Sequence, residues 1–91
     1  MVVTYDEFGG AWDHVPPPGQ DGTRGPHDEW GPGTRIPALV ISPNLHKRFG
    51  VDSRQYDTTS ILATIERRFG LRPLTSRDAS VNDLLGLVGR R

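Results

Sequence analysis

Two adjacent carboxylates, Asp6 and Glu7, follow directly after a β-like run at the start of the chain. Carboxylate oxygens are the ligands that hard divalent cations prefer, and in α/β sheets ligands gather at the carboxyl ends of strands. Adjacent strand residues point to opposite faces, so both side chains reach one ion only if the chain bends here, which Gly9 and Gly10 make easier. The spacing predicts a metal-centred hydrolase site, and a solvated acidic pair that opens a turn is the alternative.

A second pair of titratable residues, Asp13 and His14, stands in the loop that follows. A carboxylate next to an imidazole can ligate a metal ion, protonate a leaving group or contact a substrate. The same pair can also form a loop turn in which the acid caps the backbone and the ring packs on the prolines that follow. The remaining histidines, His27 and His46, have no ligand spacing, and we expect them at the surface.

Three hydroxyl side chains, Thr58, Thr59 and Ser60, stand at the expected start of a helix. The dipole and the free N–H groups of a helix N-terminus can bind phosphate or activate a hydroxyl. N-capping uses the same residue types at the same positions. We favour capping and assign no catalytic residue to this segment.

Two short strands, one long loop and two helices are expected to position these residues, which makes the fold class α/β. The continuous apolar run of residues 38–41 is typical of a strand that is covered on both faces, as in a parallel sheet. Helical spacing of apolar residues, a capping-box pattern at Thr75–Asp78 and a glycine after Phe69 indicate the helices. The expected bounds within a single partial domain of residues 1–91 are 1–8 for the first strand with the acidic pair, 9–35 for a pocket loop, 36–42 for the second strand, and 57–69 and 76–88 for the helices.

The pocket loop, residues 9–35, is rich in glycine and proline and contains Trp12 and Trp30. A connection of this length inside a compact domain is usually functional or disordered. The two tryptophans argue against a simple solvated linker, so we expect the loop to lie over a pocket. A different class of protein stays open on the same residues, namely a small non-catalytic binding domain that uses this loop as its contact surface.

Composition excludes several other functions. The 91 residues contain 11 basic and 11 acidic side chains, so no long-range field draws in nucleic acid or an anionic membrane. The chain has no cysteine, which removes disulfides, thiolate metal sites and cysteine nucleophiles. We expect neither a signal peptide nor a membrane-spanning stretch in these residues, and the sequence predicts no compartment.

Three ordered segments, Thr4–Pro18, Gly33–Pro43 and Tyr56–Glu66, together resemble the C-terminal part of a known family, and the resemblance continues through Leu71–Ala79. This is the bacterial phosphoesterase family that includes non-specific phospholipases C and acid phosphatases, within the alkaline-phosphatase-like superfamily. The resemblance implies an α/β sandwich that holds a metal at its strand ends and uses a Ser or Thr nucleophile.

The resemblance also assigns the site residues. Asp6 and Glu7 match the family's metal-binding acidic pair, and Asp13 and His14 match its Asp-His motif, which we take as pocket lining. Many members have a histidine where this chain has Thr58. The family's nucleophile lies well upstream of the acidic pair, so no catalytic residue is expected in this chain.

The expected function follows from this resemblance. The chain is expected to be part of a metal-dependent phosphoesterase that hydrolyses phosphate mono- or diesters, phospholipids included, with membrane lipid only as substrate. Alone it should be inert, because an N-terminal half with the nucleophile is expected to be missing. Carboxylate ligands favour Ca²⁺, Mg²⁺ or Mn²⁺ over zinc. Full-length relatives are often secreted or exposed on the cell surface.

Overall fold

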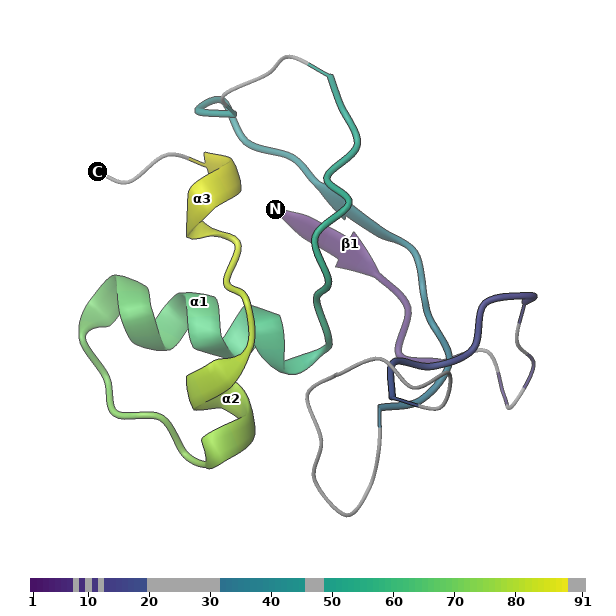
Figure 1. The fold of residues 1–91 in the computed structure, drawn as a ribbon. Helices are drawn as coiled ribbons and strands as arrows, with labels where there is room; N and C mark the ends of the chain where they lie inside the picture. Colours follow the sequence, from purple (N-terminus) through teal and green to yellow (C-terminus); the bar gives the residue numbers. More distant parts are fainter. Residues whose placement is uncertain (8, 10, 12, 20–31, 46–48, 89–91) are drawn as a thin grey trace. The chain divides into compact units, whose positions relative to one another are not determined.

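The structure is a computed structural model that describes residues 1–7, 9, 11, 13–19, 32–45 and 49–88. It divides into two compact units, Met1–Val40 and Ile41–Arg91. The first unit holds both strands and the second holds the three helices of the described chain (Figure 1). The α/β class expected from the sequence is confirmed. None of the helices in the described part of the chain is long and apolar enough to cross a membrane.

The first unit is organised around a small antiparallel sheet. Strand β1 (Val2–Thr4) pairs with β2 (Ala38–Val40), and Val3 lies opposite Leu39. The Thr4 hydroxyl donates a hydrogen bond of 2.7 Å to the carbonyl of Pro37, just before β2 begins. This contact ties the exit of β1 to the entry of β2.

The expectation of a parallel sheet covered on both faces is wrong for these strands. They pair antiparallel, and the Leu39 side chain is 63% exposed. Within the described residues of this unit no helix is present to cover the sheet. A continuous apolar run indicates that a strand can be buried, but it does not identify the element that covers the strand.

Helix α1 (Thr59–Phe69) is the longest element of the second unit. Its N-terminus is held by Asp57, whose carboxylate accepts a hydrogen bond of 2.6 Å from the Thr59 N–H. It ends at Gly70, which adopts the left-handed conformation with φ 67° and donates its N–H to the Glu66 carbonyl. Glycine reaches this conformation without the steric cost that a Cβ brings.

Helix α2 (Ser76–Ser80) begins with the capping box that the sequence predicts. Thr75 accepts a hydrogen bond from the Arg77 N–H, and the Asp78 carboxylate accepts one from the Thr75 N–H. The hydrogen bond from the Thr75 hydroxyl is the main cause that lowers the pKa of Asp78 to about 2. The carboxylate is therefore ionised and fixed at the start of α2.

The second C-terminal helix expected over residues 76–88 is in fact two short helices. Helix α2 stops at Ser80, Val81 is extended, and α3 (Leu85–Val88) begins anew. Asp83 explains the break, because its carboxylate accepts a hydrogen bond of 2.9 Å from the Leu85 N–H and so starts a turn. The three helices of the described chain lie in one unit, in green to yellow in Figure 1.

The core of the second unit is small. Helices α1 and α2 pack together, and α3 supplies a further buried side chain. Its buried apolar side chains are Ala63, Val81, Leu84 and Leu85. Three of these belong to the apolar spacing that predicted one continuous helix. The spacing thus identified the buried side chains even though the backbone between α2 and α3 is not helical.

Candidate functional site

The acidic pair lies where the sequence places it, at the exit of β1. Asp6 and Glu7 follow the strand by two and three residues, and both are exposed. Within the described residues no group of three or more His, Asp or Glu side chains is arranged to hold a metal ion. A hard cation takes about six to eight oxygen ligands. The pair has the right donor chemistry and can supply only part of such a site.

Asp13 is held by partners of its own. Its carboxylate accepts a hydrogen bond of 3.0 Å from the Val15 N–H and pairs at 2.5 Å with the Nε atom of Arg35. The Val15 hydrogen bond, followed by Arg35, lowers the pKa of Asp13. The Thr34 hydroxyl also donates to the carbonyl of Ala11, at 3.5 Å. These contacts join the two ends of the pocket loop.

His14 is exposed. Among the described residues, no hydrogen bond or ion pair connects Asp13 or His14 to the acidic pair. The capping of a turn by Asp13, through the Val15 N–H, was one of the alternatives from the sequence. Arg35 was not anticipated, because it is 22 residues away and only its opposite charge could have indicated it. Trp12, Trp30, His27 and His46 lie outside the described residues, so the expected Trp-containing contact surface stays a prediction.

The hydroxyl groups at the start of α1 are committed to the helix. The Thr59 hydroxyl donates to the Asp57 carboxylate, and the Oγ atom of buried Ser60 accepts a hydrogen bond of 3.0 Å from the Asp57 N–H. Thr58 makes no side-chain capping bond. The hydroxyl groups of Thr59 and Ser60 thus serve the helix start, as the capping interpretation expected, but the acceptor for the Thr59 N–H is the Asp57 carboxylate and not Thr58.

A second charged contact anchors the same segment. The other carboxylate oxygen of Asp57 pairs at 3.0 Å with the Nε atom of Arg77 on α2, and the two side chains are only 8% and 15% exposed. Asp57 therefore connects the start of α1 to α2. The sequence did not reveal this pair, because 20 residues separate its members.

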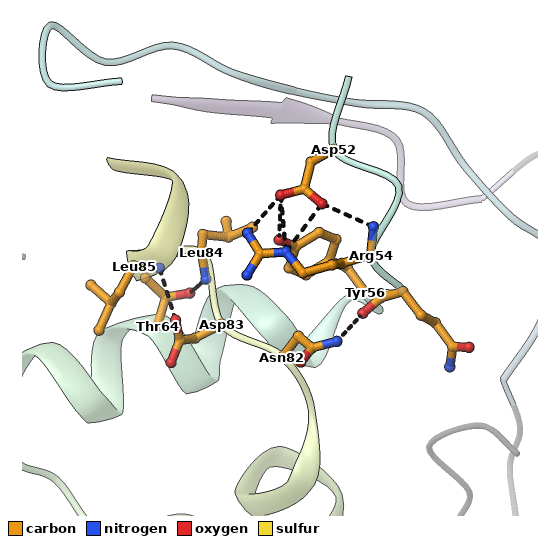
Figure 2. A network of polar contacts seen from close by, with 9 residues as sticks. Asp52, Arg54, Tyr56, Thr64, Asn82, Asp83, Leu84 and Leu85 are labelled. Carbon is orange, nitrogen blue, oxygen red and sulfur yellow. Dashed lines mark hydrogen bonds and ion pairs between the residues drawn. The ribbon is translucent and has the colours of Figure 1, made fainter. Parts of the chain in front are cut away.

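A polar network joins the approach to α1 with the segment before α3 (Figure 2). Asp52 binds the Arg54 guanidinium at 2.6 Å and accepts a hydrogen bond of 3.2 Å from the Tyr56 hydroxyl. The Asn82 amide donates to the carbonyl of Gln55 at 2.7 Å. These contacts fix the path of the chain into the helix-start motif.

Side chains further along α1 form similar contacts. The Leu84 N–H donates a hydrogen bond of 2.9 Å to the Thr64 hydroxyl, as Figure 2 shows. Arg67 donates to the carbonyls of Ala79 and Val81, at 3.0 and 2.9 Å, and pairs with Asp83 at 2.9 Å. The broken segment between α2 and α3 is thus stabilised by side chains of α1.

Comparison with known proteins places these elements in a family. Residues 1–72 match the model of the Phosphoesterase family. Non-specific phospholipase C3 of Arabidopsis thaliana is 38% identical over 99% of this chain and 20% of its own length. Phospholipase C B of Mycobacterium tuberculosis is 38% identical over 92% of this chain and 20% of its own length.

The chain spans about a fifth of the length of these relatives. No solved structure matches it significantly. The matched region contains the acidic pair, the Asp13–Arg35 tie, both strands and α1. The family match covers most of the chain, and the chain belongs to the phosphoesterase family.

Proposed function

We propose that this chain supplies two carboxylate ligands, Asp6 and Glu7, to the divalent metal centre of a phosphoesterase. The position of these carboxylates at the exit of β1, within the region that matches the family, is the observation that supports the proposal. The remaining ligands and a Ser or Thr nucleophile would come from another segment of polypeptide, in an alkaline-phosphatase-like α/β sandwich. Ca²⁺, Mg²⁺ and Mn²⁺ fit carboxylate donors better than zinc does.

The substrate class is a phosphate ester, and within it we favour the phosphodiester of a phospholipid. The support is the naming of the relatives, which are phospholipases C. A divalent ion in such a site supplies positive charge to the phosphoryl oxygens. The part of this chain is to orient two carboxylates, since Thr4 ties the exit of β1 to Pro37 and thereby fixes where the acidic pair begins.

We also propose that the 91-residue chain has no hydrolytic activity alone. Two carboxylates are too few to fix a hard cation, and the Thr59 and Ser60 hydroxyls at the start of α1 are engaged in hydrogen bonds with Asp57. Phosphoryl transfer needs a nucleophile and a metal ion in one geometry. Activity is therefore expected only when the chain is combined with a phosphoesterase segment that brings the missing groups.

A chimera tests this function directly. The segment of Mycobacterium tuberculosis phospholipase C B that aligns with this chain is replaced by the chain, and hydrolysis of phosphatidylcholine and of a soluble phosphate monoester is measured. We expect hydrolysis that a chelator abolishes and a divalent metal restores. Asp6→Asn or Glu7→Gln should each lower the rate by roughly 100-fold or more, because loss of a ligand costs at least as much as loss of a ligand's supporting partner.

Asp13→Asn is the matched control, since Asp13 is an exposed acid of the same unit that is engaged with Arg35. It should leave the metal concentration needed for half-maximal activity unchanged. A folded, active chimera in which Asp6→Asn and Glu7→Gln have no more effect than Asp13→Asn would refute the ligand assignment. Hydrolysis by the 91-residue chain alone would refute the proposed inertness.

A further inference from the structure

Four apolar side chains are exposed where α1 ends and the chain turns toward α2. They are Ile65, Phe69, Leu71 and Leu74, which are 46, 68, 56 and 77% exposed. Ile65 and Phe69 lie one helical turn apart and therefore on one face of α1. The buried residues of α1 are Ser60, Ala63 and Glu66. We call the segment from Ile65 to Leu74 the α1–α2 corner.

The same corner is positively charged. Residues 65–74 contain three arginines and one acidic residue, Glu66, which is buried. Arg67 pairs with Asp83, although its side chain is 36% exposed. The other two arginines, Arg68 and Arg72, are exposed.

Arg68 and Arg72 differ from Arg67 in their contacts. The Arg68 guanidinium lies 5.5 Å from the centroid of the Phe69 ring. Neither Arg68 nor Arg72 forms an ion pair with a described acidic residue. The corner therefore combines apolar side chains with two cations that have no described carboxylate partner.

We propose that the α1–α2 corner binds the surface of an anionic phospholipid membrane. Apolar side chains that enter the acyl boundary, flanked by arginines that reach lipid phosphates, are the usual composition of an interfacial binding surface. The local excess of arginine favours a lipid surface over a neutral apolar protein partner. The proposal deepens the proposed function, on which it rests for its biological sense, because a phosphoesterase that acts on phospholipids has to reach them at a membrane.

Vesicle co-sedimentation of the full 91-residue chain tests the surface without any need for hydrolysis. Vesicles of phosphatidylcholine alone are compared with vesicles that also contain phosphatidylserine. We expect binding to the anionic vesicles that falls as salt is added. An arginine near an anionic surface is worth about 1 kcal/mol, so Arg68→Gln should lower the partition coefficient roughly 5-fold and the double variant with Arg72→Gln roughly 25-fold.

Matched variants separate the corner from other exposed residues. Phe69→Ser should lower binding at least about 10-fold, because a buried phenylalanine contributes more than 1.4 kcal/mol. Phe49→Ser is its control, since Phe49 is 92% exposed elsewhere in the same unit. Arg35→Gln is the control for loss of one exposed charge. Arg68→Lys, which keeps the charge, should retain binding, and far-ultraviolet circular dichroism verifies that each variant retains the helices.

Absence of binding to anionic vesicles would overturn the inference. Equal losses for Phe69→Ser and Phe49→Ser, or for Arg68→Gln and Arg35→Gln, would also overturn it. Recovery of the corner as a contact with a protein segment, with no affinity for lipid, would count against it in the same way. None of these outcomes affects the acidic pair, whose metal dependence is measured in the chimera on a soluble monoester as well as on lipid.

Discussion

Asp57 is expected to contribute more to stability than any other exposed or half-buried acid of the described chain. One carboxylate oxygen accepts a hydrogen bond of 2.6 Å from the Thr59 N–H, and the other pairs with Arg77 at 3.0 Å. The first contact caps α1 and the second connects α1 to α2. Two variants separate them, since Asp57→Ala removes both contacts whereas Asp57→Asn keeps an oxygen that can accept the Thr59 N–H.

The magnitudes follow from the two contacts. Loss of an N-cap costs about 0.5–2 kcal/mol, and loss of a hydrogen bond to a charged group costs about 1.5–3 kcal/mol. Asp57→Ala should therefore lower the free energy of unfolding by roughly 2–5 kcal/mol. Asp57→Asn should lower it by about 1.5–3 kcal/mol, because asparagine caps as well as aspartate, whereas the NH2 group that replaces the second oxygen cannot accept the hydrogen bond from Arg77.

Urea denaturation followed by circular dichroism at 222 nm measures these differences, because α1 is the longest helix of the described chain. When Arg77→Gln is already present, Asp57→Asn should lower the free energy of unfolding by less than it does in the unchanged chain, because the effects of substitutions at two residues in contact are not additive. Asp52→Asn is the control, since its partner Arg54 is half-exposed and the change in stability should be smaller. Equal stabilities of the Asp57→Ala, Asp57→Asn and Asp52→Asn proteins would refute the assignment of Asp57 as a connection between the helices.

Two further predictions concern α1. Burial and the neighbouring Asp78 raise the pKa of Glu66 above its ordinary value of 4.5, against the opposing effects of the Leu74 N–H and Arg67. The folded state thus binds the Glu66 proton more tightly than the unfolded state does. The resulting contribution to the free energy of unfolding is present below the unfolded pKa and is lost as the pH rises through the folded pKa. Glu66→Gln should flatten this part of the pH profile of the free energy of unfolding, and parallel profiles would contradict it. Gly70→Ala should lower the free energy of unfolding by about 1 kcal/mol because of the left-handed conformation, whereas Gly33→Ala, without that conformation, should not.

Local signals in the sequence predicted the helical elements better than the sheet. The Thr75–Asp78 capping box and the glycine after Phe69 are short-range patterns, and both are present as predicted. Strand pairing is a long-range property, so the run at residues 38–41 could not indicate whether its partner was parallel or whether helices covered it. The break between α2 and α3 depends on Asp83 and on Arg67, and apolar spacing alone contains no information on such contacts.

The candidate site also has features that the sequence predicts and features that it does not. The donor chemistry of Asp6 and Glu7 and their place after β1 follow from residue type and local pattern. The partners of Asp13 and Asp57 do not, because Arg35 and Arg77 are 22 and 20 residues away. Opposite charge allows an aspartate to pair with any arginine of the chain. Only the fold determines which arginine lies close enough to do so.

Stability and candidate chemistry lie in different units of this chain. The buried apolar side chains and the shielded Asp57–Arg77 pair belong to the helical unit, whereas the acidic pair follows a two-stranded sheet with exposed side chains. A two-stranded sheet is only marginally stable by itself, and ordering its backbone costs about 1–2 kcal/mol per residue. A metal ion that bound Asp6 and Glu7 in the isolated chain would have to offset this cost with two carboxylates. The metal affinity of the isolated chain should therefore be low even if both residues are ligands, which is why the chimera, where further polypeptide surrounds the strands, is the decisive test of the acidic pair.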